Sequence, residues 1–297
     1  MDNRDAVSAF LRSRRGRITP GQAGLPVYGQ RRVPGLRRGE VAALAGVSVE
    51  YYTRLERGNL QGVSDSVLDA VARALRLDAT ERMYLYDLAR AAGPAPGARV
   101  RRRPSRTTVR PSVARIVAGM AGLPAFVMNN RLDTLAANPL GRALYSQMFA
   151  DAACAGNVAR FAFLTPAARR FYTDWERMAR FAVGALRVEA GRDPDDRELS
   201  RLIGELSTRS DDFRVMWGSQ DVHVFRESTK RLDHPLVGVL ELDQETMSLP
   251  DESGLSVLVY SAAPGTPAEN ALKLLAGWSA TTGQEQDAES AGELHRP

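Results

Sequence analysis

The stretch LRRGEVAALAGVSVEYYTRLERG, residues 36–58, decides the fold of the N-terminal part of this 297-residue chain. Its spacing predicts two short helices, at about 37–45 and 49–57, that cross steeply around a tight turn at Gly46. Ser48 is the expected N-cap of the second of these helices. The apolar residues expected at the crossing are Val41, Leu44, Val47, Tyr52 and Leu55. The pattern indicates a helix-turn-helix.

The outer face of the predicted 49–57 helix is free to enter the major groove of DNA. Arg54 can donate two hydrogen bonds to guanine, and Glu50 can accept one from cytosine N4. Val49 or Thr53 can contact a thymine methyl group. We therefore expect these four side chains to read base edges.

Phosphate contacts are expected beside this helix. Ser48, Arg37 and Arg38 lie where helix N-termini and guanidinium groups meet phosphates. Arg31 and Arg32, in the preceding loop, can reach phosphate or the minor groove, as basic arms do in other proteins. Such contacts would fix register and affinity rather than sequence preference.

Both sets of residues also fit a purely structural role. On a solvated helical hairpin, Arg54 and Arg57 would pair with Glu50 and Glu56, and Glu50–Arg54 has the favourable i,i+4 orientation. The loop at residues 16–35, which is rich in proline and glycine, would then be a connector on which Arg31 and Arg32 are solvated.

Charge is distributed unevenly along the chain. Residues 1–110 contain 21 Arg against 10 Asp and Glu, whereas residues 111–297 contain 19 Lys and Arg against 25 Asp and Glu. A basic N-terminal region is the electrostatic footprint of a domain that binds a polyanion. Five helical patterns fit into residues 1–93, so the sequence predicts an all-α DNA-binding domain there.

A linker is expected after this domain. Residues 94–112 read PAPGARVRRRPSRTTVRPS, a proline- and arginine-rich stretch with few apolar residues. The predicted organisation is therefore a DNA-binding domain at 1–93, a linker at 94–112, a second domain at 113–279 and a disordered polar tail at 280–297.

The second domain mixes strands and helices. A short strand pair is expected within residues 125–138, amphipathic helices between 139 and 217, and three strands within 221–264. A last helix is expected at about 267–278. Two strands, inserted helices and three further strands predict an α+β, PAS-like domain with a roughly five-stranded antiparallel sheet.

A sensor domain needs an apolar cavity with a few polar groups that hold one end of a ligand. Any of the apolar candidates can instead be ordinary core, and the polar candidates can be strand-end charges in solvent, with His234 bound to backbone groups. The apolar candidates are Phe126, Met128, Phe163, Trp175 and Trp217. The polar candidates are His223, Arg226, Lys230 and His234.

Catalysis is not indicated. The three histidines, His223, His234 and His295, lack metal-ligand spacing, and no phosphate-binding glycine motif occurs. The single cysteine, Cys154, has no adjacent base, and it cannot form an intrachain disulfide, which fits a reducing cytoplasm. No apolar run approaches the ~20 residues of a membrane span. We expect no catalytic residue, metal, cofactor or membrane partner, and a nucleoid-associated cytoplasmic protein.

The chain resembles a known family. Residues 36–58 and the surrounding five helices are similar to the lambda-repressor-type helix-turn-helix. RRVPGLRRGEVAALAGVSVEYYTRLERG resembles the MmyB-like subgroup of bacterial xenobiotic-response-element-type regulators. The resemblance continues to about residue 278 through LTPAARRFYTDWERMAR, DPDDRELSRLIGELSTRS, TKRLDHPLVGVLELDQETMSLPD and VLVYSAAPGTPAENALKLLA. It implies transcription control and a PAS-like ligand-binding domain with a fatty-acid-like ligand. Gly39 departs from the family, which usually has glutamate there.

These observations predict a sequence-specific transcriptional regulator that binds a double-stranded operator as a homodimer. Its second domain would bind a small apolar, fatty-acid-like effector. An alternative is a DNA-binding regulator whose second domain is only a dimerisation or protein-interaction module. A third hypothesis, an enzyme fused to a DNA-targeting module, would need a cluster of perturbed ionisable groups in a cleft.

Overall fold

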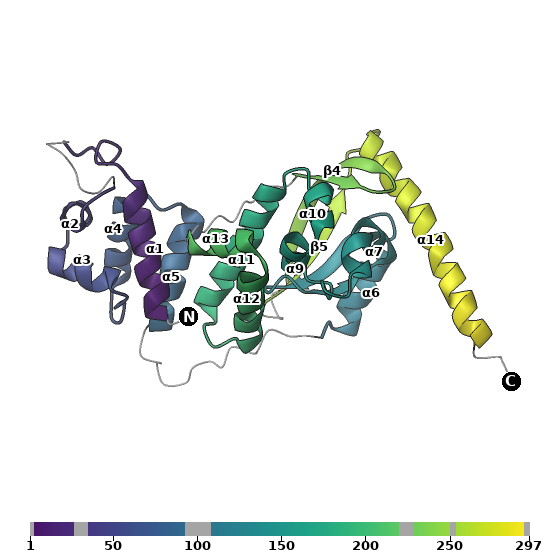
Figure 1. Cartoon of the computed structure of the whole chain (residues 1–297), viewed down its shortest axis with the longest axis horizontal. Coiled ribbons are helices and arrows are strands. Elements are labelled where there is room, and N and C mark those ends of the chain that lie inside the picture. Colours follow the sequence, from purple (N-terminus) through teal and green to yellow (C-terminus); the bar gives the residue numbers. More distant parts are fainter. Residues whose placement is uncertain (1–2, 27–34, 93–107, 220–228, 250–253, 294–297) are drawn as a thin grey trace. The chain divides into compact units, whose positions relative to one another are not determined.

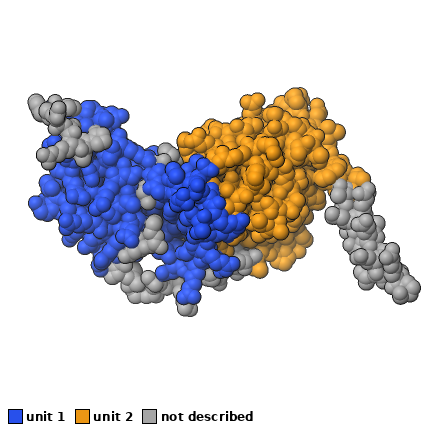
Figure 2. Space-filling view, in the orientation of Figure 1, with its two compact units in different colours: residues 1–101, 183–224 blue, residues 102–182, 225–297 orange. Residues whose placement is uncertain are grey.

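The computed structural model describes residues 3–26, 35–92, 108–219, 229–249 and 254–293. The chain divides into two compact units, coloured separately in Figure 2, and each is described by itself. The first unit comprises Met1–Arg101 and Val183–Val224, and the second comprises Arg102–Ala182 and Phe225–Pro297.

Five helices form the N-terminal part of the first unit among its described residues, as the sequence predicted (Figure 1). They enclose one core, in which the rings of Phe10 and Tyr84 meet edge to face with centroids 5.1 Å apart. The helices are α1 (Asn3–Arg17), α2 (Arg38–Ala45), α3 (Val49–Glu56), α4 (Asp65–Ala74) and α5 (Ala79–Ala92).

The turn between α2 and α3 has the predicted chemistry. Gly46 is left-handed, with φ of 65°. The Ser48 hydroxyl accepts a hydrogen bond from the Tyr51 N–H at 3.0 Å, which confirms the expected N-cap. The prediction that Leu44 lies in the core is wrong, because this residue is 39% exposed. The residues that α2 buries are Val41, Ala42 and Ala45.

Gly39 weakens α2 without a steric reason. A Cβ added there would meet only Val49 Cγ2, at 3.8 Å, which is an ordinary van der Waals contact. Because glycine costs a helix up to about 1 kcal/mol relative to alanine, Gly39→Ala is expected to raise the free energy of unfolding by up to that amount. Urea titration of the full chain measures the change; a loss of stability would contradict the prediction.

Later helices complete the first unit. They are the part of α11 (Trp175–Arg192) that begins at Val183, α12 (Arg197–Arg209) and α13 (Asp211–Gly218). The sequence analysis assigned these residues to the second predicted domain. Helical periodicity shows that a helix has an apolar face, but it does not show which core that face covers.

The second unit contains a five-stranded antiparallel sheet with helices, as predicted. Its strand order is β2-β1-β5-β4-β3. The predicted strand at 221–232 lies partly outside the described residues. The strands are β1 (Ala125–Asn129), β2 (Thr134–Ala137), β3 (Thr229–His234), β4 (Gly238–Ser248) and β5 (Leu255–Ser261). The helices are α6 (Pro111–Gly119), α7 (Pro139–Leu144), α8 (Ser146–Ala150), α9 (Val158–Leu164), α10 (Pro166–Phe171), the first part of α11, and α14 (Pro267–Glu293).

The sheet has two different faces because side chains alternate along each strand. On one face Val113 and Val117 of α6 pack against Val127 and Val257 of the sheet. The opposite face carries Phe126 and, in the neighbouring β5, Tyr260, whose rings meet edge to face.

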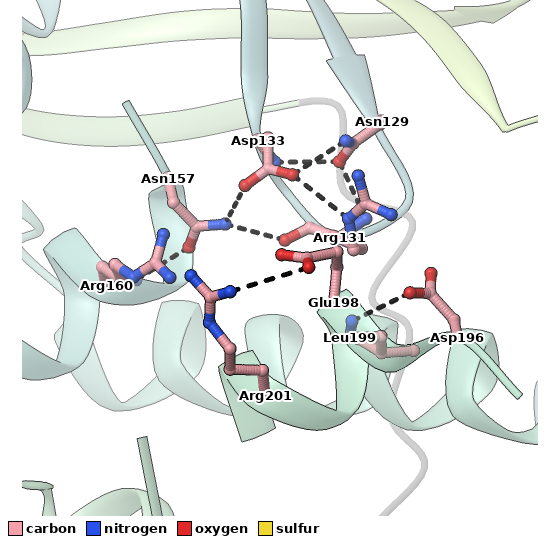
Figure 3. Close-up of polar contacts among 9 residues, drawn as sticks. All are labelled: Asn129, Arg131, Asp133, Asn157, Arg160, Asp196, Glu198, Leu199 and Arg201. Atoms are coloured by element: carbon pink, nitrogen blue, oxygen red, sulfur yellow. Dashed lines mark hydrogen bonds and ion pairs between the residues drawn. The ribbon is translucent and has the colours of Figure 1, made fainter. Parts of the chain in front are cut away.

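A satisfied polar network holds the β1–β2 turn (Figure 3). Asn129 Oδ1 accepts hydrogen bonds from the N–H groups of Arg131 and Asp133, at 2.9 and 3.0 Å. Asn157 Nδ2 donates to Asp133 Oδ1 at 2.7 Å. Both amides use their oxygen and their nitrogen within the fold, so we assign this network a structural role.

The last helix is longer than expected. α14 continues to Glu293, whereas the sequence analysis ended it at about Trp278 and predicted a disordered tail from 280. Residues 279–293 contain no proline and several good helix formers, alanine, glutamine and glutamate, which explains why a helix can continue there.

Candidate functional site

α3 presents the predicted reading residues on its outer face. Glu50 and Arg54 are exposed, Val49 is 45% exposed, and Thr53 is half-buried. The residues that α3 buries are Tyr52, Leu55 and Glu56. The face is therefore available to a partner, with the donor, acceptor and methyl groups that base recognition requires.

The Arg54 side chain is oriented by a neighbour that the sequence analysis missed. Its guanidinium carbon lies 4.7 Å from the centroid of the Tyr51 ring, in a cation–π contact. The ion pair with Glu50 that the structural alternative required is not formed among the described residues. An aromatic residue three positions before an arginine on the same helical face was the available signal.

The residues expected to contact phosphate differ in their exposure and in the partners that they already have. Arg37 is exposed, and its backbone N–H donates to Glu40 Oε2 at 2.6 Å. Arg38 is half-buried, and its Nη2 lies 3.3 Å from Glu56 Oε1. Ser48 is exposed but uses its hydroxyl for the cap of α3. The expected contacts Arg31 and Arg32 lie outside the described residues.

A buried carboxylate, which the structural alternative would have placed on a solvated face, fixes the end of α3. The Glu56 side chain is 0% exposed, and its two oxygens accept hydrogen bonds from Arg15 Nη2 and Nε at 2.8 and 2.9 Å. Arg38 and Arg12 lie 3.3 and 3.6 Å from the same carboxylate. Glu56 therefore ties α3 to α1 and to the start of α2.

This cluster keeps Glu56 ionised. Burial by itself would raise the pKa of Glu56, but the hydrogen bonds and positive charges of Arg15 and Arg38 outweigh burial and lower that pKa. The same hydrogen bond raises the pKa of Arg15. Burial, and then the negative charge of Glu56, raises the pKa of Tyr52 beside them.

Four predicted ligand residues share one face of the second unit's sheet. Strand register places them there, because the β1–β5, β5–β4 and β4–β3 pairings align alternate positions across the sheet. They are Phe126 and Met128 in β1, and Lys230 and His234 in β3.

Aromatic rings cover this face, and three of them carry buried hydroxyls. The Tyr145 ring lies 5.5 Å from that of Phe126 and 5.1 Å from that of Phe171. The hydroxyls of Tyr145 and Tyr260 share a hydrogen bond of 2.9 Å, and within the described part of the chain the buried Tyr172 hydroxyl next to them makes no hydrogen bond of good geometry. Burial raises the pKa of all three tyrosines, so their hydroxyls stay protonated.

Lys230 is a half-buried cation on the same face. Its Nζ lies 5.1 Å from the centroid of the Phe181 ring. Burial, and then the positive charge of Arg177, lowers the pKa of Lys230. Within the described part of the chain no hydrogen bond or ion pair engages this ammonium group.

His234 is a core histidine. It is 1% exposed, and its Nε2–H donates to the Ala143 carbonyl at 3.1 Å while Nδ1 accepts from the Leu236 N–H at 3.2 Å. Burial lowers the pKa of His234. Because both ring nitrogens bind the backbone, we withdraw His234 from the candidate ligand contacts.

The remaining predicted ligand residues do not gather at one place. Phe163 and Trp175 contact each other with ring centroids 6.0 Å apart, and Trp175 Nε1 donates to the Ala162 carbonyl at 2.8 Å. Trp217 belongs to the first unit, where its ring stacks on Phe213 at 5.6 Å. The candidates His223 and Arg226 lie outside the described residues.

Metal binding and membrane spanning find no support in the described segments. No group of three or more His, Cys, Asp and Glu side chains there could hold a metal ion. None of the described helices has the length and apolar character that a membrane crossing requires.

Two protein-family models match the chain, one in its N-terminal part and one in its C-terminal part. A family model for a helix-turn-helix domain matches residues 6–85, and the model of the MmyB-like transcription regulator ligand binding domain matches residues 109–275. No curated protein matches the chain. The second model covers more than half of the sequence. The two domains make the protein a DNA-binding transcription regulator with a ligand-binding domain, not an enzyme, and the chain belongs to the MmyB-like family of transcription regulators.

Proposed function

We propose that the protein reads an operator through α3 as a homodimer and responds to a fatty-acid-like ligand held on the aromatic face of its PAS-like domain. The observation that carries the DNA-binding part is the exposed outer face of α3, buttressed from behind by the buried Glu56 cluster. Preorganised donors on a rigid helix are what sequence-specific recognition requires.

The proposed interface divides into reading and positioning residues. Arg54, held over Tyr51, reads guanine, and Glu50 accepts from cytosine. Val49 and Thr53 supply apolar contact to a thymine methyl. The positioning residues are Arg37, the N-terminus of α3 at Ser48, and the loop arginines Arg31 and Arg32.

Arg54→Ala is expected to weaken operator binding by about ten- to a hundredfold, because a bidentate base contact contributes about 1–3 kcal/mol. The affinity of this variant for random DNA is expected to fall far less. Loss of one arginine removes at most one phosphate contact, which mainly changes how strongly binding depends on salt. Fluorescence-anisotropy titrations with operator and random DNA at two salt concentrations measure both. Arg73→Ala, an exposed arginine on α4, is the matched control. Equal losses on both DNAs would contradict direct readout.

The ligand proposal rests on Lys230 and the tyrosine hydroxyls. Phe126, Phe171 and neighbouring rings are buried against one another and would have to part to admit an acyl chain, to which they offer an apolar surface. A half-buried ammonium group that makes no hydrogen bond or close ion pair among the described residues, with only the more distant charge of Asp174 opposing it, suits a carboxylate, because charge-assisted hydrogen bonds are the strong ones. The Tyr172 hydroxyl offers a second donor.

Lys230→Met is expected to weaken binding of hexadecanoate by about tenfold or more, because a hydrogen bond to a charged group contributes about 1.5–3 kcal/mol. Hexadecanol, which lacks the carboxylate, should bind both proteins alike. Lys273→Met removes the only other lysine, which pairs with Glu269 on α14, and should leave binding unchanged. Isothermal titration calorimetry gives the affinities.

The alternative, a second domain that serves only for dimerisation, has one observation in its favour. Leu274 and Trp278 lie one helical turn apart on α14 and are 69% and 46% exposed. Absence of hexadecanoate and hexadecanol binding by the wild-type chain, together with a dimer in sedimentation equilibrium, would favour that alternative.

A further inference from the structure

The helices α11 to α13 contact the DNA-binding helices within the first unit. Gly191 of α11 is so close to α5 that an added Cβ would lie 2.6 Å from Tyr84 Cε2. Next to it, Arg192 Nε donates to Asp87 Oδ2 at 3.2 Å, and Asp87 is only 8% exposed. Close backbone approach and a partly buried ion pair make this a specific docking surface.

α13 contributes to the same docking surface. The Ser219 carbonyl, directly after α13, accepts hydrogen bonds from Ser13 and Arg17 of α1, each at 3.2 Å. The buried Arg187 lies over the Trp217 ring at 4.2 Å and donates to the Trp217 carbonyl. Arg187 thereby holds α13 against α11, and α13 in turn contacts α1.

Packing at this surface is incomplete. A pocket of about 100 Å³ lies among α1, α5, α11, α12 and α13, and its lining includes Ala6, Leu88, Ile203 and Trp217. A pocket of this size has room for several water molecules between its walls. The helices that line it are therefore not in direct contact over that part of the docking surface.

α1 contacts the docked helices and the reading helix at the same time. Ser13 and Arg17 bind the residue after α13, whereas Arg15 binds Glu56 at the end of α3. The carbonyl of Arg4 lies against Gly58, just after α3. A displacement of α13 along α1 therefore reaches the helix that we propose reads the operator.

α11 also takes part in the second unit. The division between the units falls at Val183, inside this continuous helix. Before that residue, Phe181 lies beneath Lys230, and Trp175 binds the Ala162 carbonyl. One hydrogen-bonded helix therefore carries a contact of the proposed ligand face and the docking surface for the DNA-binding helices.

We infer that α11 couples the two functions: ligand bound at Lys230 alters the docking of α11 to α13 on α1 and α5, and this changes operator affinity. The inference rests on the proposed function and adds the route of regulation. Coupling between two sites requires one element whose arrangement both sites bias. In this proposal α11 is that element, because residues of this one helix contact both the proposed ligand face and the DNA-binding helices.

The test measures a coupling ratio, the operator dissociation constant with saturating hexadecanoate divided by that without it, for the full chain. We expect the wild-type ratio to differ from one by about fivefold or more. Gly191→Leu, which forces α11 away from Tyr84, should bring the ratio to within about twofold of one. Gly204→Leu on α12, where an added Cβ meets nothing within 4 Å, should behave as wild type.

A charge swap at the same surface keeps the test decisive if Gly191→Leu fails to fold. Arg192→Asp places two carboxylates together and should also uncouple the sites, whereas Asp87→Arg combined with Arg192→Asp should restore the wild-type ratio; all three proteins carry Arg90→Ala, because Arg90 also pairs with Asp87 at 3.2 Å. A wild-type ratio kept by both Gly191→Leu and Arg192→Asp would overturn the inference alone. A wild-type chain without operator binding, or without any response to hexadecanoate, would overturn the proposed function and this inference with it.

Discussion

Replacing Glu56 by alanine is expected to lower the free energy of unfolding by about 3–5 kcal/mol, because removal of one partner from a buried ion pair leaves uncompensated charge. The carboxylate is fully buried and receives two hydrogen bonds from Arg15, which is itself only 17% exposed at the side chain. Without Glu56, the guanidinium groups of Arg15 and Arg38 repel each other in a partly dry site. Operator binding should be lost together with the orientation of α3.

Urea denaturation of the full chain measures this loss. Glu50→Ala is the matched control, because Glu50 lies on the same helix but is exposed and surface substitutions change stability by only about 0.5 kcal/mol. If Glu56→Ala and Glu50→Ala lost similar amounts, the structural role of the Glu56 cluster would be refuted.

The Glu56 contribution should depend on pH. Because the folded-state pKa of Glu56 lies below its unfolded value, the contribution is fully present above the unfolded value of about 4.3. It is lost as the pH falls through the lowered folded-state pKa. The stability difference between wild type and Glu56→Gln should therefore shrink only in acid, below that unfolded value.

Gly58→Ala is expected to lower the free energy of unfolding by about 2–5 kcal/mol. Gly58 has φ of 91°, and a Cβ there would lie 2.4 Å from the carbonyl oxygen of Arg4. A left-handed backbone costs a residue with a side chain about 1–2 kcal/mol. Overpacking against a backbone atom that cannot turn aside adds about 1–3 kcal/mol.

Gly62→Ala separates the two causes. Gly62 is also left-handed, with φ of 72°, but an added Cβ would meet nothing within 4 Å. Its substitution should cost only the backbone part, about 1–2 kcal/mol. Thermal or urea unfolding of both variants gives the comparison, and equal losses would show that α1 does not approach Gly58 as closely as described.

The helix-turn-helix could be predicted because its determinants are local. Gly46 and Ser48 mark the turn and the cap, and helical spacing alone sets which side chains of α3 face outward. Glu56 could not be identified in this way. Its partners come from positions 12, 15 and 38, and periodicity does not report contacts between separate helices.

Only part of the proposed ligand face could be anticipated from the sequence. Strand alternation brought Phe126 and Lys230 to one face, but the tyrosine hydroxyls were missed, because Tyr145 and Tyr260 are 115 residues apart. The membership of α12 and α13 in the first unit was likewise invisible, since an amphipathic helix carries no label of the core it covers.

Selection of binding sites from random duplex DNA by the whole 297-residue chain tests whether α3 reads an operator. We expect one enriched motif with two inverted half-sites about 10 base pairs, or roughly 34 Å, apart. Each half-site should contain a guanine that Arg54→Ala no longer selects. Recovery of no enriched sequence, with binding that depends on salt alone, would contradict this expectation.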